Sequence, residues 1–181
     1  MYIPPNFKIL FDPQQISNAL WIDEWQVLKE FKDGRVVSRF SEYWTEKLYG
    51  FKKSNNSNTS GHDGTIENPL FGTLYVCVRS LTKTGIKFQQ SKFIGSGRNC
   101  TSDNLIESIK GIDFEIVVDI VDFPCILLSA VSADNLLKMI EDGKITPGGL
   151  SRIGYYSKVF NTTFDKMSVK TINPYQGSDS N

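Results

Sequence analysis

One stretch of the chain, residues 85–98 with the sequence GIKFQQSKFIGSGR, combines cationic, amide and aromatic side chains without any acid. Lys and Arg supply charge for phosphate contacts, and Gln and Arg can form two hydrogen bonds to one base edge. The acid-free run extends from Asn68 to Ser102, although the whole chain carries 20 basic and 20 acidic residues. The pattern predicts a nucleic-acid-binding surface; a solvated strand face with ordinary lysines is the alternative. The candidate contacts are Arg79, Lys83, Lys87, Gln89 and Arg98.

A carboxylate stands just ahead of this stretch, because the sequence GHDGT places Asp63 in a polar loop shortly before a β-rich segment. A hard cation such as Mg²⁺ takes oxygen ligands at about 2.0–2.1 Å, and a loop carboxylate can be one of them. Gln90 and Lys92 lie two residues apart, which puts their side chains on the same face of a strand. These three residues predict a hydrolytic metal site; a turn-forming Asp without a ligand is the other interpretation of Asp63.

Length and composition indicate one packed domain, because 181 residues with 40% hydrophobic side chains can bury a core. We expect the domain to cover residues 1–171 and residues 172–181 to form a disordered tail. No apolar run reaches the roughly 18 residues of a membrane span, and the N-terminus lacks a signal-peptide pattern. We therefore expect a cytoplasmic protein without a membrane partner. Three separated cysteines and a single histidine argue against a structural zinc site.

The apolar pattern divides the chain into helices first and strands later. Apolar residues at steps of three and four predict amphipathic helices over residues 14–31 and 37–48. The β-rich segments 72–80 and 86–94 flank the turn sequence TKTG and predict an antiparallel hairpin. The three tryptophans fall on helical spacing and are expected in the core: Trp21, Trp25 and Trp44.

Downstream of the hairpin, helices and apolar strands alternate. Ser or Thr caps and terminal glycines predict helices over residues 101–111 and 132–143, with another over about 150–160. The apolar runs 114–121 and 125–131 are typical of strands covered on both faces. Asp119 lies inside such a run and is the acid expected to be buried. The fold class predicted is therefore mixed α/β, with a central mixed sheet, an antiparallel hairpin and flanking helices.

This order of elements resembles the PD-(D/E)xK nucleases, in particular the small type II restriction endonucleases. The sequence SEYWTEKLYG resembles the family's first core helix, whose glutamate would be Glu42 or Glu46. The sequence HDG would carry the family aspartate at Asp63. The x-x-K strand has two candidate registers. QSK keeps the lysine, whereas CVR, residues 77–79, lies in the more typical strand but lacks both acid and lysine.

The resemblance implies a restriction-endonuclease-like fold and a Mg²⁺-dependent, homodimeric endonuclease that hydrolyses double-stranded DNA at a short specific sequence. Asp63 would be the principal metal ligand and Gln90 a second ligand, with Glu42 or Glu46 completing the set. Lys92 would position the attacking water. We expect QSK to be the catalytic motif, because lysine is a compact donor and the Cys77 thiol is a poor Mg²⁺ ligand.

Two other functions remain open on the sequence. The first is a non-catalytic protein whose basic hairpin binds nucleic acid or an acidic assembly partner. The second follows from GTLYV and KFIGSGRN, which resemble the hairpin of GIY-YIG nucleases with Tyr75 and Phe93 in place of the two tyrosines. That family also needs an arginine in the following helix, which this sequence does not have. His62 has no neighbouring Ser or Cys nucleophile and is expected on a loop surface.

Overall fold

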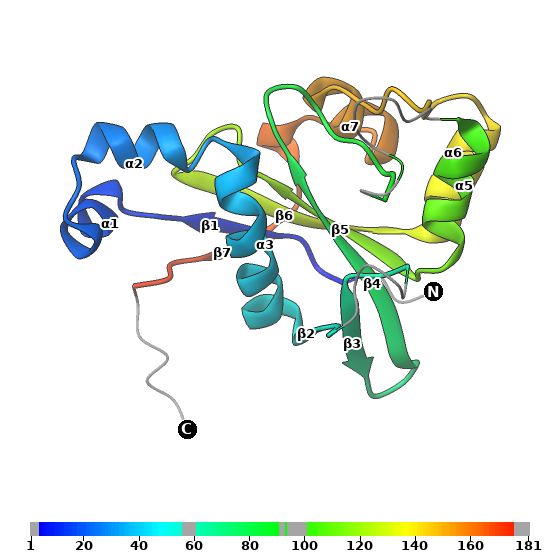
Figure 1. Cartoon of the computed structure of the whole chain (residues 1–181), viewed down its shortest axis with the longest axis horizontal. Helices are drawn as coiled ribbons and strands as arrows, with labels where there is room; N and C mark the ends of the chain where they lie inside the picture. The colour runs from blue at the N-terminus through cyan, green and yellow to red at the C-terminus, as the bar shows by residue number, and fades with distance from the viewer. Residues whose placement is uncertain (1–3, 56–60, 91–92, 94–100, 176–181) are drawn as a thin grey trace.

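The computed structural model of the chain describes residues 4–55, 61–90, 93 and 101–175. Within these residues the strands form one mixed sheet of seven, in the order β2-β3-β4-β5-β6-β1-β7, and helices flank it (Figure 1). Neighbouring strands are antiparallel except for two parallel pairs, β4 with β5 and β1 with β7. The strands are β1 Phe7–Leu10, β2 Phe51–Lys53, β3 Gly64–Asn68, β4 Gly72–Leu81, β5 Phe114–Asp119, β6 Cys125–Ser132 and β7 Lys170–Ile172.

The helices after the hairpin region begin where their capping residues predict. Side-chain oxygens of Thr101, Ser132 and Ser151 accept hydrogen bonds from backbone N–H groups in the first turns of α5, α6 and α7. None of the helices in the described residues is long and apolar enough to cross a membrane. The helices are α1 Pro13–Leu20, α2 Glu24–Glu30, α3 Gly34–Tyr49, α5 Ser102–Lys110, α6 Ala133–Glu141, α7 Arg152–Val159 and the 3₁₀ helix η2 Phe164–Lys166.

The sheet separates two apolar cores. Helices α5, α6 and α7 pack on one face, and α2 and α3 pack on the other (Figure 1). Strand β5 serves both cores, because Val117 belongs to the first and Ile116 and Val118 belong to the second. Every residue of β5 is buried, which confirms the prediction of an apolar strand covered on both faces. Asp119 is buried at the end of this strand, as its position in the sequence indicated.

The predicted helix over residues 14–31 is wrong in one respect, because the chain breaks it into α1 and α2. Trp21 ends α1 in a left-handed conformation with φ 55°, and Asp23 starts α2 with a capping box. Trp21 is 96% exposed and Trp25 is 60% exposed, so neither belongs to the core. Helical spacing identified an apolar face, but Val27 and Phe31 occupy the buried side instead. Of the three tryptophans, Trp44 packs against the core.

The predicted hairpin over 72–80 and 86–94 is also wrong, although its first strand exists as β4. The antiparallel partner of β4 is β3, which lies before it in a segment expected to be a loop. The other edge of β4 pairs with β5, and the described residues 86–90 do not pair with β4. In the described part of this segment, one isolated bridge joins Ile86 to Leu150, and Phe88 is buried. The hairpin on which the GIY-YIG resemblance depends is therefore not formed by the described residues.

Two terminal strands complete the far edge of the sheet. Strand β1 was not predicted, and it pairs antiparallel with β6 while burying Phe7 and Ile9. Strand β7 includes Ile172, and the Tyr175 hydroxyl accepts a hydrogen bond from the Asp12 N–H at 3.0 Å. The described chain thus remains attached to the domain beyond residue 171, where a tail was expected to begin. Residues 176–181 lie outside the described residues.

Candidate functional site

Asp63 lies immediately before β3, where backbone pairing fixes its position. Its N–H donates to the Val76 carbonyl at 3.0 Å, and its own carbonyl accepts from the Ser54 N–H at 2.9 Å. Gly64 follows it because a Cβ there would clash with the Lys52 carbonyl and the Phe51 ring. The Asp63 carboxylate accepts a hydrogen bond from the Val78 N–H at 2.8 Å. Asp63 lies just before the first residue of β3, and its side chain extends the hydrogen bonding along β4 to Val78.

Arg79 connects Asp63 with a second carboxylate. Arg79 Nη1 lies 3.8 Å from Asp63 Oδ2, and Arg79 Nε lies 3.7 Å from Glu115 Oε2 on β5. The arginine side chain is only 18% exposed. Burial by itself would lower the pKa of Arg79, but nearby negative charge, chiefly that of Glu115, raises it above its usual value. Arg79 is therefore a largely buried, permanent cation beside two acids.

Glu115 is the most enclosed acid of the site. Its side chain is fully buried, and neither carboxylate oxygen has a hydrogen-bond partner among the described residues. Burial raises the pKa of Glu115 to about 7, an effect that Arg79 opposes and Asp63 reinforces. In the parallel pairing of β4 with β5, Glu115 is the partner of Cys77. The CVR strand thus has a carboxylate beside its first residue, supplied by the neighbouring strand.

A hollow of about 390 Å³ opens beside Asp63 and Arg79 at the exposed edge of β4. Glu42 of α3 lines the same hollow, and its carboxylate accepts from Lys53 Nζ of β2 at 2.6 Å. Glu46, the other glutamate considered from the sequence, is exposed on α3 and does not line this hollow. Of the two candidates, Glu42 is the one that the structure brings to Asp63.

Gln90 approaches the loop of Asp63 but does not direct its oxygen there. Gln90 Nε2 donates to the Gly61 carbonyl at 2.9 Å, and its backbone N–H donates to Ser108 Oγ at 3.0 Å. The Cys77 thiol lies 3.8 Å from the same Gly61 carbonyl. Gln90 therefore holds the loop that carries Asp63. Lys92 and Arg98, two further candidates, lie outside the described residues.

The expected nucleic-acid contacts do not form one described surface. Lys83 and Lys87 are exposed, whereas Arg79 is only 18% exposed and lies beside two carboxylates at the hollow of Asp63. Gln89 is buried, and its Nε2 donates to the Pro147 carbonyl at 3.0 Å. Its amide cannot reach a base edge from this position, so that expectation is corrected. The reason is that Ile86 and Phe88 of this segment pack in the same core as residues of α5 and α7, and the segment makes an isolated bridge to Leu150 and no outer strand.

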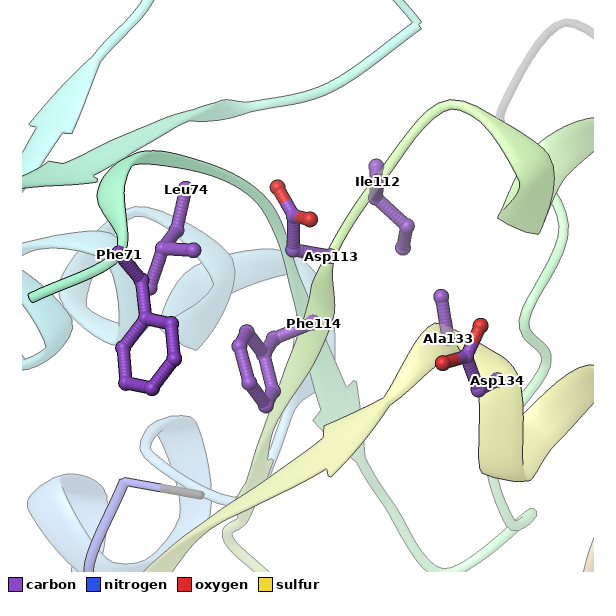
Figure 2. Close-up of a pocket in the computed structure, with 7 residues that line it drawn as sticks. All are labelled: Phe71, Leu74, Ile112, Asp113, Phe114, Ala133 and Asp134. Atoms are coloured by element: carbon purple, nitrogen blue, oxygen red, sulfur yellow. The ribbon is translucent and has the colours of Figure 1, made fainter. Parts of the chain in front are cut away.

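A second pocket, about 260 Å³ in volume, lies at the opposite end of β4 and β5 (Figure 2). Figure 2 shows the rings of Phe71 and Phe114 on one side of this pocket and the carboxylate of Asp134 on the other. Asp113 also lines it and accepts a hydrogen bond from the Tyr75 N–H at 2.7 Å. Two carboxylates beside aromatic rings repel phosphate, which makes this pocket a poor place for a nucleic-acid backbone.

The donor set around Arg79 suits a divalent cation held by few protein ligands. The described residues contain no group of three or more His, Cys, Asp or Glu side chains arranged around one point. Asp63 and Glu115 nevertheless offer hard carboxylate oxygens, and those of Glu115 have no hydrogen bonds. Mg²⁺ is commonly held by one or two carboxylates while it keeps several waters. A cation at Asp63 would compete with Arg79 for the carboxylate, so we expect modest affinity.

Comparison with protein-family models gives no match for this chain, and neither curated proteins nor solved structures give one. The chemistry of the Asp63, Arg79 and Glu115 cluster is therefore the basis for a functional proposal. The sequence patterns single out Asp63 but not Glu115. The available signal was the position of Glu115 inside an apolar strand, because a buried charge needs a charged or metal partner.

Proposed function

We propose that this protein is a Mg²⁺-dependent endonuclease that hydrolyses phosphodiester bonds in double-stranded DNA. The observation that carries the proposal is the fixed position of the Asp63 carboxylate, bonded to the Val78 N–H beside Arg79. The elements around it keep part of the expected order: the helix α3 with Glu42, the loop of Asp63, the helix α5, and the strands β5 and β6, with a hairpin of β3 and β4 in place of the expected one. This order supports the resemblance to PD-(D/E)xK nucleases.

The roles within the proposed site follow from the geometry. Asp63 would hold Mg²⁺, with Glu42 across the same hollow, and the ion would supply Lewis-acid stabilisation and an activated water. Water would attack phosphorus as the bond to the sugar oxygen breaks, with its proton passing to bulk solvent and the leaving oxygen taking a proton from solvent. Arg79 would donate to the phosphate oxygens from a permanently charged, planar fork. The structure places Arg79 against Asp63, so we now favour CVR over QSK as the strand motif of the site.

A DNA endonuclease that cuts a short symmetric sequence is expected to act as a homodimer, because each subunit then cuts one strand. Homodimer formation is part of the proposal. Light scattering with size-exclusion chromatography measures the mass directly, and the chain alone has 20.4 kDa. We expect a mass near twice this value in the presence of DNA.

The second candidate function is a non-catalytic nucleic-acid-binding or assembly protein. It is favoured by the departures in the strand motif, where Cys77 and Arg79 replace the acid and the lysine. It is also favoured by the two exposed lysines near the turn after β4, Lys83 and Lys87. A protein of this kind would bind DNA with and without Mg²⁺ and would leave it intact.

The test is to incubate the protein with plasmid DNA of mixed sequence, with Mg²⁺ or with a chelator, and to separate the products on a gel. We expect nicked or linear DNA with Mg²⁺ only, and none from the Asp63→Asn variant. Asp142→Asn serves as the matched control, because Asp142 is exposed and pairs only with Lys144 in the described structure. If the wild-type protein leaves the plasmid intact at every Mg²⁺ concentration, the nuclease proposal is wrong and the non-catalytic binding function replaces it.

A further inference from the structure

The pocket at the Phe71 end of β4 combines an apolar floor with an acidic rim (Figure 2). Its volume is about 260 Å³, whereas an apolar cavity of about 150 Å³ is already large enough to hold benzene. Water on an apolar floor finds few hydrogen-bond partners, so an apolar group gains affinity by displacing it. The floor consists of lining residues whose exposed fractions are all below a tenth: Leu74, Ile112, Phe114 and Ala133.

Two exposed acids lie at the rim of this pocket, and neither has a Lys or Arg partner in the described part of the chain. Asp113 accepts one hydrogen bond, from the Tyr75 N–H to Oδ2 at 2.7 Å. Asp134 lies in the first turn of α6, where the helix dipole favours an acid. These local contacts account for each acid separately, but they leave the negative charge beside an apolar pocket without a cation.

Two phenyl rings stand on the other side of the pocket from the Asp134 carboxylate (Figure 2). Phe114 is 4% exposed and belongs to the floor, whereas Phe71 is 54% exposed and lies at the rim. A phenyl face attracts a cation within about 6 Å of its centre, and it also packs well against another flat apolar group. The rings and the acids therefore favour the same kind of ligand, one with an apolar body and a positive charge.

Other classes of ligand match the pocket less well. A phosphate or a carboxylate would be repelled by the two acids. A hard metal ion prefers to surround itself with oxygen ligands, and the apolar floor supplies none. A neutral apolar molecule could cover the floor, but it would make no use of the charge at the rim. An organic cation uses both parts of the pocket.

We propose that this pocket binds an organic cation, namely a primary ammonium or guanidinium group on a short aromatic or aliphatic body. The body packs against Phe71 and Phe114, and the charged group faces Asp134 while Asp113 adds negative charge beside it. The hollow of Asp63 lies at the other end of β4, so this binding site goes beyond the nuclease function and does not depend on it. A free amine and a lysine or arginine side chain of a partner peptide both offer this chemistry.

The experiment uses 4-fluorobenzylamine as the probe and the full chain as the receptor. Fluorine NMR follows the probe as protein is added, and the uncharged 4-fluorobenzyl alcohol is the matched ligand control. We expect the amine to bind at least about fivefold more tightly than the alcohol, since a partly exposed ion pair can contribute about this factor. The difference should shrink when the salt concentration rises from about 0.05 M to about 0.5 M, because salt screens exposed charges.

Variants at the rim test which acids hold the cation. Asp134→Asn removes one charge, and Asp113→Asn removes the other while its amide oxygen can still accept from the Tyr75 N–H. We expect each variant to bind the amine up to about fivefold more weakly and the alcohol unchanged. Asp142→Asn is the control, because Asp142 is an exposed acid at the other end of α6. Circular dichroism confirms that each variant is folded.

Two further measurements locate the probe and identify the source of the cation. Backbone amide shifts in two-dimensional NMR should change at residues 113–114 and 133–134, which line the pocket. Nα-acetyl-lysine amide is then added as a competitor. Displacement of the probe supports a lysine side chain of a peptide partner as the ligand, and a probe that stays bound supports a free arylalkylamine.

The comparison of the two probes in the wild type tests the proposal even if a variant does not fold. Equal binding of the amine and the alcohol overturns the proposal, and so does full amine binding by a folded Asp113→Asn/Asp134→Asn double variant. Shift changes confined to the hollow of Asp63, or to the one beside Trp21 and Asp23, also overturn it, because those hollows contain acids too. None of these outcomes depends on whether the protein cleaves DNA.

Discussion

The Asp63 carboxylate accepts a hydrogen bond from the Val78 N–H at 2.8 Å, and this contact fixes the loop before β3 against the middle of β4. The same carboxylate lies 3.8 Å from the Arg79 guanidinium. The Asp63 side chain therefore satisfies a backbone N–H of β4 and also contributes negative charge to the candidate site. Stability and activity should respond differently to changes at this residue.

We predict that Asp63→Asn and Asp63→Ala separate these two contributions. Asparagine keeps an acceptor for the Val78 N–H, whereas alanine leaves that N–H without its partner, which costs about 1–3 kcal/mol. Both variants lose the anionic ligand and should not cleave DNA. Urea denaturation followed by circular dichroism measures the difference in unfolding free energy. Equal stability of the two variants would show that the Val78 contact contributes little.

We predict that CVR, residues 77–79, is the catalytic strand motif and that QSK, residues 90–92, is not. Lys92→Ala should cut DNA at the wild-type rate, and Arg79→Met should be folded and inactive, because Arg79 is the cation that lies against Asp63. Arg79→Lys keeps the charge but loses the planar fork, so we expect reduced cleavage in place of none. Cleavage rates on plasmid DNA measure this. If Arg79→Met cuts DNA normally and Lys92→Ala is inactive, QSK is the catalytic motif and this prediction is wrong.

We predict that Glu115 makes the protein less stable as the pH rises. Its pKa is raised from 4.5 to about 7, so the native state holds this proton more tightly than the unfolded state does. Stability from this group is present below about pH 4.5 and is lost as the pH passes through 7. Besides burial, Arg79 lowers and Asp63 raises the pKa of Glu115.

Urea denaturation between pH 4 and 8 measures this dependence as the difference between wild type and Glu115→Gln, which cannot titrate. The subtraction removes contributions that both proteins share, such as that of Asp119, whose pKa burial also raises. A difference between the two curves that does not change with pH would mean that Glu115 has an ordinary pKa in the folded protein.

We predict that Lys83 and Lys87 contribute to salt-dependent DNA binding. Each neutralised phosphate contributes about 0.9 to the slope of log affinity against log salt, so Lys83→Gln with Lys87→Gln should lower its magnitude by at most about 1.8. Fluorescence anisotropy with a labelled duplex provides the affinities. Lys138→Gln with Lys166→Gln is the control, because both lysines are exposed and lie elsewhere, on α6 and η2. An unchanged slope would leave the two lysines as part of a solvated surface.

Local sequence signals predicted much of the fold, and non-local contacts account for what they missed. Thr101 and Ser132 cap their helices as expected, because a cap needs only neighbouring backbone groups. The partner of β4 was misassigned, because strand pairing depends on which segment of the folded chain lies along the edge of β4. Trp21 was placed in the core since spacing alone cannot say which side of a helix is covered.

The candidate site, too, was predicted from the sequence only in part. Asp63 could be identified from its residue type and its position before a strand, because both are visible in the sequence. Glu115 became part of the site only through the register that sets it beside Cys77, 38 positions earlier in the chain. The two partners of Arg79 also come from separate parts of the chain, Asp63 from the loop before β3 and Glu115 from β5.

The two edges of the sheet bear on how copies of this protein could assemble. Both edge strands, β2 and β7, have three residues each, and lysines occupy them: Lys52, Lys53 and Lys170. Short, positively charged edges discourage the addition of a strand from another molecule. If two copies paired through these edge strands, their lysines would repel each other, and three residues would provide few backbone hydrogen bonds to offset the repulsion. A homodimer should therefore form through helices or loops and keep each seven-stranded sheet separate.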